Sequence, residues 1–440
     1  MAIAAHFDLE IDQGDAVLAF TNSDLDEEIF CDLPDGFKVD GKVALLVKAL
    51  YGLRRAPRLW HQTLTAALKK LGLKASTEDP CVFTNDRQIS FFYVDDMLHM
   101  YRKRDAEHIA TFKKDLNDQF EMHDEGEIRW FLGVQIIRDR PNRKLWLNQA
   151  SYIEKITRKF NLLEGSHNFP SIPLPTAPLS KFEGQAEPRS IKLYQEKVGS
   201  ILYAAIMTRP DVARAAAELS KYLTNPSPRH HEAADQAIRY LYATRFLSIE
   251  YSAQDDDILV IASDASFADD IEDRKSSQGY VIKLFGGPIV WKASKQNTVT
   301  TSTTEAELLA LEQTAKETYA LNRLFRDVAL DLGDPIKLYC DNQQTIRLVV
   351  GENERITTKL RHVDIQNMWL RQEFKKGQFS VAYLPTNDMP ADGLTKPLPR
   401  QRFEQFVRLL GLVDLEQRIL EQGYADDDEV DWSDDEENED

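Results

Sequence analysis

At 440 residues the chain exceeds what one hydrophobic core usually organises, which excludes a single compact fold and favours two or three domains. With 42% hydrophobic and 29% charged residues, its composition is that of globular protein and indicates that most of the chain folds. The formal net charge is −18 but falls to −7 without the last 16 residues, so charge neither supports nor excludes a polyanionic ligand.

Short apolar runs alternate with amphipathic stretches over residues 1–162, which predicts a mixed α and β region. One such stretch, Leu59 to Leu71, has its apolar residues at helical spacing. Residues 163–190 are rich in Pro, Ser and Gly and lack periodicity, as expected of a surface linker. A domain boundary is therefore expected in this linker.

The chain after the linker predicts a second group of elements. Residues 191–252 form an expected connection of three packed helices, separated by the breakers TRP and NPSP. Residues 253–400 combine strand-like runs, such as ILVIASDAS and GYVIKLFGGPIVW, with a long helical pattern, which predicts an α/β domain. Residues 401–424 are expected to be a helical segment. The tail 425–440 holds 11 acidic and no basic residues, so we expect it to be disordered.

Two adjacent aspartates, Asp95 and Asp96, interrupt the apolar stretch ISFFYVDDMLHMY. Because successive strand residues face opposite sides of a sheet, such a pair at a hairpin turn can share a bound divalent cation. Magnesium, a hard cation that prefers oxygen ligands, suits this position. Taken alone, the tripeptide VDD is more often a plain turn between two hydrophobic strands.

The surroundings of the pair reverse that balance, because YVDD resembles the polymerase motif of copia-type reverse transcriptases. The segment DQGDAVLAFTNSDLDEEIFCDLPDGF is similar to the family's first catalytic segment, and KALYGLRRAPRLW to its nucleotide- and template-contacting segment. STEDPCVF, FLGVQI and LNQASYIEKITRKF follow in family order. The resemblance implies a partial reverse-transcriptase palm and thumb in which Asp15, Asp95 and Asp96 hold the metals.

The same resemblance implies two-metal nucleotidyl transfer from dNTPs to a DNA primer on an RNA template. Two Mg²⁺ ions per active site are expected, with Mn²⁺ as an alternative. The match begins just before Asp15, so we expect an N-terminal truncation that removes the family's fingers region. Where the family has lysine then glutamine before AP, this chain has Arg54 and Arg55. We therefore expect primer extension to be very weak.

Four further acidic residues lie in distinctive surroundings: Asp264 in ASDASFADD, Glu307 in STTEAELLAL, Asp341 in LYCDNQQT and Asp392 in MPADGLTKPL. The predicted elements place them on a strand, in a helix, at a strand end and near a helix start. Carboxylates from separate elements are what a two-metal phosphodiesterase requires, since its ions lie about 4 Å apart at the scissile phosphate. Any one acidic residue taken alone is more often solvated surface.

In this order the four motifs resemble the copia-type RNase H domain, as do DRKSSQGYVIKLFGGPIVWKASKQ and RHVDI between them. The resemblance implies hydrolysis of RNA in RNA/DNA hybrids at a complete set of metal-binding carboxylates. Glu305 is an alternative to Glu307; we prefer Glu307 because the residues after it match the family pattern, and Glu305 lies about 200° around the helix. His362 either assists product release or packs beside the following helix, and packing is the more frequent role of a lone histidine.

From about Phe7 to Leu412 the chain thus resembles a copia-type LTR retrotransposon polyprotein, with an expected α/β and α+β multidomain fold. Basic clusters that a nucleic-acid backbone could use recur along it, although each alone is more often solvated surface: Arg54 to Arg58, Arg102 to Arg104, Arg138 to Lys144 and Lys155 to Lys159.

Location and activity are less closely specified by the sequence. Its three cysteines fit neither a disulfide framework nor a zinc site, and no apolar run reaches 18 residues. We therefore expect an intracellular protein, cytoplasmic or nuclear, with no membrane partner. Three functional readings remain: an enzyme, a non-catalytic nucleic-acid binder and an inert retrotransposon remnant. The preserved carboxylates favour the enzyme, and the oligomeric state is not indicated.

Overall fold

The computed structural model describes residues 1–163, 169–332, 336–351 and 361–422. It divides into two compact units. The smaller unit comprises Phe7–Ile128 and Ala320–Asp331, and the larger unit comprises Met1–His6, Arg129–Tyr319 and Leu332–Asp440. Both units mix helices and strands, which confirms the predicted α/β and α+β multidomain class. Within the described residues, no helix has the length and apolar character needed to cross a membrane.

The smaller unit is built on a six-stranded sheet in the order β4-β5-β6-β7-β1-β8. Its strands are β1 (Glu10–Ala16), β4 (Lys74–Ala75), β5 (Val82–Thr84), β6 (Gln88–Tyr93), β7 (Asp96–Tyr101) and β8 (Met122–Glu127). Two helices, α2 (Ala56–Lys70) and α3 (Ala106–Asn117), pack on the sheet, where Trp60 and Phe112 join Met97 in one core. The helix predicted from the apolar spacing around Leu64 is therefore confirmed.

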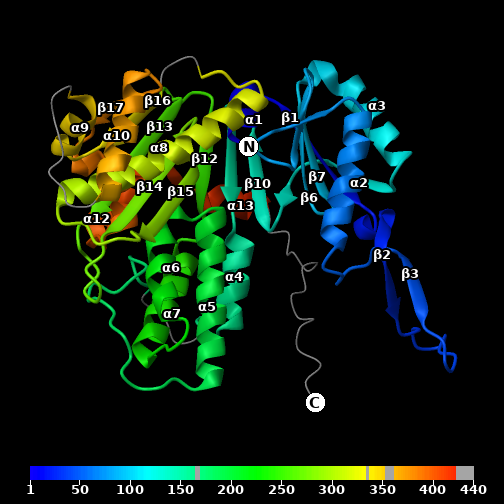
Figure 1. Ribbon diagram of the computed structural model, residues 1–440, viewed down its shortest axis with the longest axis horizontal. Helices are drawn as coiled ribbons and strands as arrows, with labels where there is room; N and C mark the ends of the chain where they lie inside the picture. Colours follow the sequence, from blue (N-terminus) through cyan, green and yellow to red (C-terminus); the bar gives the residue numbers. More distant parts are fainter. Residues whose placement is uncertain (164–168, 333–335, 352–360, 423–440) are drawn as a thin grey trace. The chain divides into compact units, whose positions relative to one another are not determined.

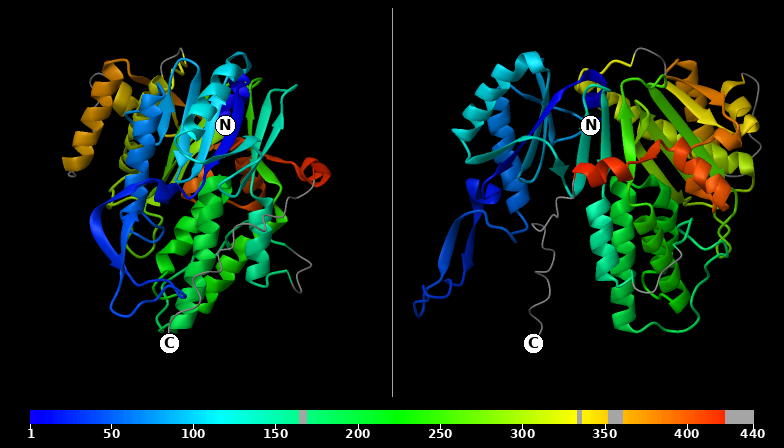
Figure 2. Two further views of the ribbon diagram at one scale, coloured as in Figure 1. Left: turned by 90° about the vertical axis from the view of Figure 1, so that its right-hand side faces the viewer. Right: turned by 180° about the vertical axis from the view of Figure 1, so that it is seen from behind.

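A two-stranded ribbon, β2 (Asp24–Cys31) and β3 (Ala44–Lys48), extends away from the six-stranded sheet of its unit (Figures 1 and 2). The strands pair antiparallel, with Phe30 opposite Leu45. The ribbon and its connecting loop leave large apolar side chains in solvent: Phe37 of the loop is 73% exposed and Val47 of β3 is 71% exposed. Because a two-stranded ribbon has no second layer, it cannot bury these side chains itself.

The larger unit contains a five-stranded sheet in the order β15-β14-β13-β16-β17. Its strands are β13 (Leu259–Ser266), β14 (Ser277–Leu284), β15 (Gly287–Lys295), β16 (Ile336–Cys340) and β17 (Phe379–Tyr383). β14 pairs antiparallel with β13 and β15, whereas β16 runs parallel to β13 and β17. The long helix α8 (Thr303–Asp327) crosses one face of this sheet (Figure 1). These elements confirm the strands and the long helix predicted within residues 253–400.

A second five-stranded sheet of the larger unit, in the order β18-β12-β11-β10-β9, joins three distant parts of the chain. Its strands are β9 (Trp130–Phe131), β10 (Val134–Asp139), β11 (Lys144–Asn148), β12 (Leu247–Ser252) and β18 (Leu412–Asp414). β12 pairs with β11 on one side, where Leu145 faces Tyr251, and with β18 on the other, where Ile249 faces Leu412.

This pairing explains two differences from the sequence-based domain limits. The larger unit resumes at Arg129, whereas the predicted boundary lies at residues 163–190, because strands on both sides of that linker hydrogen-bond to each other. Residues 191–252, predicted as a connection of three helices with the helical pattern ending at about Phe246, end in the strand β12. Of the predicted helical segment 401–424, the described residues 401–422 are mainly helical as expected, but they also contribute β18.

Four helices pack beside these sheets: α4 (Ala150–Lys159), α5 (Pro188–Met207), α6 (Ala213–Leu219) and α7 (Pro228–Ala243). The last three run side by side, in agreement with the three predicted helices (Figure 1). A buried ion pair closes the turn between α5 and α6, with Arg209 Nη2 2.7 Å from Asp211 Oδ2 and neither side chain exposed. From α7, the Tyr240 hydroxyl donates to the same oxygen at 2.7 Å. The segment TRP, predicted only to break the helix, is thus a polar anchor of this layer.

Within the predicted linker 163–190, residues 169–187 precede α5 and are held by side chains of the same unit. Asn225 Nδ2 donates to the main-chain carbonyls of Phe182 and Gly184, at 3.2 and 3.0 Å. Its Oδ1 accepts from the N–H of Ala186 at 2.9 Å. Backbone tied down in this way is ordered in spite of its loop composition.

Shorter elements complete the described chain. The remaining helices are α1 (Ala2–Phe7), α9 (Gln343–Val350), α10 (Arg361–Lys375), α11 (Asp392–Thr395), α12 (Arg400–Leu409) and α13 (Glu416–Gln422). Single 3-10 turns are η1 (Ala19–Asn22), η2 (Lys103–Asp105), η3 (Pro210–Val212), η4 (Ser220–Tyr222) and η5 (Thr386–Asp388). The predicted tail, residues 425–440, lies outside the described residues.

Candidate active sites

The first carboxylate group lies at the turn between β6 and β7 in the smaller unit. Tyr93 and Asp96 are paired, so Val94 and Asp95 form a two-residue turn. On the neighbouring strand β1, Asp15 is the register partner of Asp96, which puts both side chains on one face of the sheet. The Asp95 carboxylate interacts electrostatically with both. The structure therefore brings the three predicted aspartates together.

Hydrogen bonds from other elements hold this turn. Val94 has a φ of 58°, in the left-handed region that β-branched residues rarely adopt. The indole N–H of the buried Trp60 donates to the Val94 carbonyl at 2.6 Å, and the N–H of Ala16 donates to the Asp95 carbonyl at 3.0 Å. Such a conformation persists only where neighbouring structure fixes it, and here α2 and β1 do so.

The electrostatics of this first group favour a cation. Burial, followed by repulsion from Asp95 and Asp15, raises the pKa of Asp96 to about 6. Burial and the Asp95 charge also raise the pKa of Asp15. Tyr51, whose hydroxyl lies 3.4 Å from Asp95 Oδ2, has its pKa raised by burial and by that carboxylate. Because hard oxygen donors suit Mg²⁺, the three carboxylates fit this ion, which would relieve their repulsion.

The two arginines before AP occupy different surroundings. Arg55 pairs with Asp26 and Glu27 of β2, and its Nη1 lies 2.9 Å from Glu27 Oε2. The Arg54 side chain is exposed. Arg55 therefore fastens the ribbon to the start of α2, a contact that the sequence did not indicate.

The second carboxylate group lies in the larger unit, where four elements meet. Asp264 lies on β13, Glu307 lies in the first turns of α8, Asp341 directly follows β16, and Asp392 is the first residue of α11. The predicted placements on a strand, in a helix, at a strand end and at a helix start are thus confirmed. Electrostatic interactions connect Asp264 with each of the other three, so all four predicted residues belong to one group.

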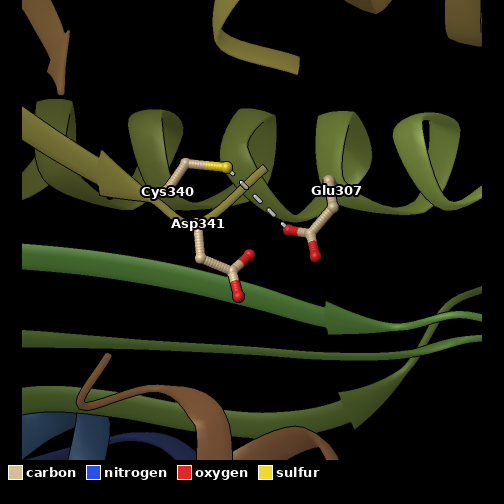
Figure 3. A group of neighbouring side chains, drawn as sticks. All are labelled: Glu307, Cys340 and Asp341. Carbon is tan, nitrogen blue, oxygen red and sulfur yellow. Dashed lines mark hydrogen bonds between the residues drawn. The ribbon is translucent and has the colours of Figure 1, made fainter. Parts of the chain in front are cut away.

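A cysteine that sequence reasoning passed over lies inside this group. The side chains of three residues each offer one potential ligand atom, and these atoms lie within 4.8 Å of one another: Glu307, Cys340 and Asp341. Figure 3 shows the Cys340 sulfur directed toward the Glu307 carboxylate, 4.0 Å from Oε2. Burial, followed by the Glu307 charge, raises the pKa of the Cys340 thiol well above its usual value, so the thiol is protonated and acts as a weak hydrogen-bond donor.

Polar side chains from two segments, one around Thr386 and one at Thr395 and Lys396, hold the other carboxylates. The Thr386 hydroxyl donates to Asp341 Oδ2 at 2.7 Å, and the Thr395 hydroxyl donates to Asp264 Oδ2. Lys396 forms an ion pair with Asp392. Neither threonine nor the lysine was singled out from the sequence, although Thr395 and Lys396 follow Asp392 by three and four residues, the spacing of one helical turn.

Burial dominates the titration of this second group. It raises the pKa of Asp264 to about 7, partly opposed by the Thr395 hydrogen bond and the Lys396 charge. Burial, followed by the Asp264 and Asp341 charges, raises the pKa of Glu307 well above its usual value. A hard divalent cation fits this donor set, because it would compensate carboxylates that the protein alone holds partly protonated.

Glu305 and His362 are the two other residues that the sequence suggests near this group. Glu305 is 1% exposed, and its Oε2 accepts from the Thr301 N–H at 2.6 Å and from the Thr301 hydroxyl at 2.8 Å. Its carboxylate therefore caps the start of α8, whereas the Glu307 carboxylate faces Cys340 and Asp341. The side chain of His362 lies outside the described residues.

We expect Asp264 to make the metal-free chain less stable as pH rises from about 4 to about 7. In that window folded Asp264, with a pKa of about 7 against 3.8 in the unfolded chain, holds a proton that the unfolded chain has lost. Because folded Asp264 keeps its proton in this window, its contribution to stability is lost as pH rises through the folded pKa. Urea unfolding in EDTA at several pH values measures this slope, which Mg²⁺ should reduce.

The matched control for this prediction is Asp264→Asn, which keeps an acceptor for Thr395 but cannot titrate. As pH rises from about 4 to about 7, the parent chain should lose stability relative to this variant. Equal slopes would show that the charge of Asp264 does not destabilise the metal-free fold.

Many side chains of the predicted basic clusters form ion pairs within the protein. In the cluster from Arg138 to Lys144, Lys144 pairs with Glu250 at 3.0 Å. In the cluster from Lys155 to Lys159, Arg158 pairs with Glu154 at 3.3 Å and Lys159 with Glu196 at 3.3 Å. Much of this charge therefore stabilises neighbouring elements.

The sequence similarity to known proteins covers both units. Residues 1–174 match a family model described as reverse transcriptase (RNA-dependent DNA polymerase). Over 94% of its length the chain is 37% identical to a retrovirus-related Pol polyprotein from transposon TNT 1-94 of Nicotiana tabacum. It covers 32% of that relative and so spans about a third of its length.

Two further similarities concern shorter parts of the chain. Over 69% of the chain, the sequence is 30% identical to a putative transposon Ty5-1 protein of Saccharomyces cerevisiae, of which it covers 99%. The solved LC11-RNase H1, isolated from compost, is similar over 31% of this chain and 91% of its own, with 15% identity and a TM-score of 0.25. The transposon relatives, the reverse-transcriptase match and the two carboxylate groups all point to the same family. The chain belongs to the family of copia-type retrotransposon Pol polyproteins, and its residues 1–174 match the reverse-transcriptase family model.

Proposed function

We propose that the larger unit hydrolyses the RNA strand of RNA/DNA hybrids at Asp264, Glu307, Asp341 and Asp392. The observation that carries the proposal is the convergence of four carboxylates from four separate elements, with raised pKa values at Asp264 and Glu307. Maintaining such a group costs stability in the absence of a ligand, so a fold that keeps it is expected to use it.

In this proposal the four carboxylates hold two Mg²⁺ ions, or Mn²⁺ ions in their place. When bound, the ions supply the charge that lowers the pKa of the attacking water and stabilises the phosphorane-like transition state. The protein's own groups orient the carboxylates: Thr386 holds Asp341 and Cys340 contacts Glu307. The partners in this reaction are the hybrid and water.

We also propose that Asp15, Asp95 and Asp96 form a metal-dependent nucleotidyl-transfer site that uses dNTPs, a DNA primer and an RNA template. The support is the register pairing of Asp15 with Asp96 and the fixed turn that carries Asp95. We expect primer extension to be much weaker than RNA cleavage, because the Arg55 side chain is held in ion pairs with Asp26 and Glu27 of the ribbon.

One incubation tests both proposals: the purified chain with Mg²⁺, dNTPs and an RNA/DNA hybrid that carries an extendable primer end, scored for RNA cleavage and for extension. We expect RNA cleavage that EDTA abolishes and that Asp341→Asn lowers about a thousandfold. The matched control is Asp388→Asn, an exposed aspartate in η5 close in sequence to Asp392. It should cleave like the parent chain.

The other outcomes separate the alternatives. Tight hybrid binding without cleavage in either metal would support a non-catalytic binder and contradict the hydrolytic proposal. Absence of both binding and turnover would support an inert remnant. Extension as strong as cleavage would contradict the expected weakness of the polymerase site.

A further inference from the structure

The helix α11 carries two buried polar residues one turn apart. Asp392 is its first residue and Thr395 its last, and both are almost completely buried, at 2% and 0% exposure. Residues three positions apart lie on the same side of a helix. A single short helix therefore presents a proposed metal ligand and a hydroxyl group to the same site.

The Thr395 hydroxyl connects two of the proposed ligands. It donates to Oδ2 of Asp264, whose side chain is itself 1% exposed, and its oxygen lies 3.0 Å from the main-chain carbonyl oxygen of Asp392. The Asp264 carboxylate comes from β13 and the Asp392 carboxylate from α11. The hydroxyl thus fixes the strand's carboxylate relative to the helix that carries the other one.

Close packing holds α11 in this place. Gly279 of β14 is the register partner of Asp264. A Cβ atom at Gly279 would lie 2.6 Å from Leu394 Cβ and 3.2 Å from Thr395 Cγ2, so α11 approaches the sheet only because residue 279 has no side chain. On its other side, α11 is packed so closely against Phe406 that a Cβ atom at Gly393 would lie 2.6 Å from that ring.

We infer that Thr395 is a positioning residue for the hydrolytic site: its hydroxyl fixes the orientation of the Asp264 carboxylate so that the remaining oxygen can ligate a metal ion. The inference rests on the proposed RNase H function. A carboxylate rotates readily about its last torsion, and a hydrogen bond to one oxygen removes that freedom before the metal arrives. Thr395 itself touches neither water nor phosphate in this role.

The inference is tested first by metal binding without substrate. The full chain carrying Asp15→Asn, Asp95→Asn and Asp96→Asn, which neutralises the other carboxylate group, is titrated with Mn²⁺ and the free ion is followed by electron paramagnetic resonance. We expect Thr395→Val to weaken Mn²⁺ binding about 10- to 100-fold, the effect of losing a hydrogen bond to a ligating carboxylate. Thr395→Ser, which keeps the hydroxyl, should restore binding to within a few fold of the parent chain.

The matched control is Thr314→Val in α8. Thr314 is also 0% exposed, but its hydroxyl donates to the Ala310 carbonyl of its own helix at 2.8 Å. It should leave Mn²⁺ binding unchanged. In hybrid cleavage, Thr395→Val should raise the Mg²⁺ concentration needed for half-maximal rate and leave the KM for the hybrid unchanged, a pattern that general loss of structure does not produce.

The outcomes distinguish this inference from the function on which it rests. A parent chain that neither binds Mn²⁺ nor cleaves the hybrid contradicts the proposed function, and the inference with it. A parent chain that does both, while Thr395→Val binds Mn²⁺ equally tightly, shows that Thr395 only packs. A loss of binding in Thr395→Val that Thr395→Ser does not restore also overturns the inference, because the hydroxyl is then not the cause.

Discussion

Glu307→Gln is expected to lower the rate of RNA cleavage in the hybrid about a thousandfold, whereas Glu305→Gln should change it little. The first substitution removes a negative charge from the four-carboxylate group, and a loss of about 4 kcal/mol of transition-state stabilisation corresponds to that factor. The second leaves a side-chain carbonyl that can still accept from the N–H of Thr301. Single-turnover cleavage with saturating Mg²⁺ measures both rates.

The two glutamates form a closely matched pair, since they lie two residues apart in α8 and are both buried, at 1% and 6% exposure. A large loss of cleavage in Glu305→Gln with little loss in Glu307→Gln would reverse their assigned roles. Circular dichroism of both variants excludes unfolding as the cause.

Asp211→Asn and Arg209→Met are each expected to destabilise the chain by about 3–5 kcal/mol. Each substitution leaves the other ionised group buried without its partner. The Arg209 Nε also lies 2.9 Å from Asp211 Oδ1, so the pair is joined by two hydrogen bonds as well as by opposite charge. Urea unfolding, monitored by tryptophan fluorescence, measures the change in the free energy of unfolding.

Arg400→Met provides the control for this prediction. Arg400 and Glu404 also form an ion pair, but 72% of the Arg400 side chain is exposed. Its removal should cost less than about 1 kcal/mol, because water and salt screen an exposed pair. If Asp211→Asn costs no more than Arg400→Met, the buried pair is not the anchor of α5, α6 and α7 that its geometry indicates.

Local sequence patterns predicted most individual elements because their physical causes are local. The hairpin around Asp95 follows from two apolar half-strands joined by a short polar turn, and α2 follows from apolar spacing around Leu64. The long helix α8 follows from its uninterrupted periodicity. The resemblance to a family then indicated which carboxylates to group, and the structure places them together.

Other features depend on partners far away in the chain and could not be read locally. Nothing in the sequence around Leu145 indicates that it faces Tyr251, about a hundred residues later. The basic residue Lys144 looked available to nucleic acid but pairs with Glu250 of the same distant strand. Arg209 lies in a run read as a helix break, because the acidic and aromatic groups that make it a buried anchor are visible only in three dimensions.

Protein synthesis delivers the strands of the sheet β18-β12-β11-β10-β9 at widely separated times. Ile249 is synthesised well before its pairing partner Leu412. At ribosomal rates of about 5–20 residues per second, the delay between the two is on the order of ten seconds or more. During that interval one edge of β12 is open to pairing with other chains. A chain that stops before residue 412 keeps this edge open permanently, so translation products that end early should be more prone to aggregate than the full-length chain.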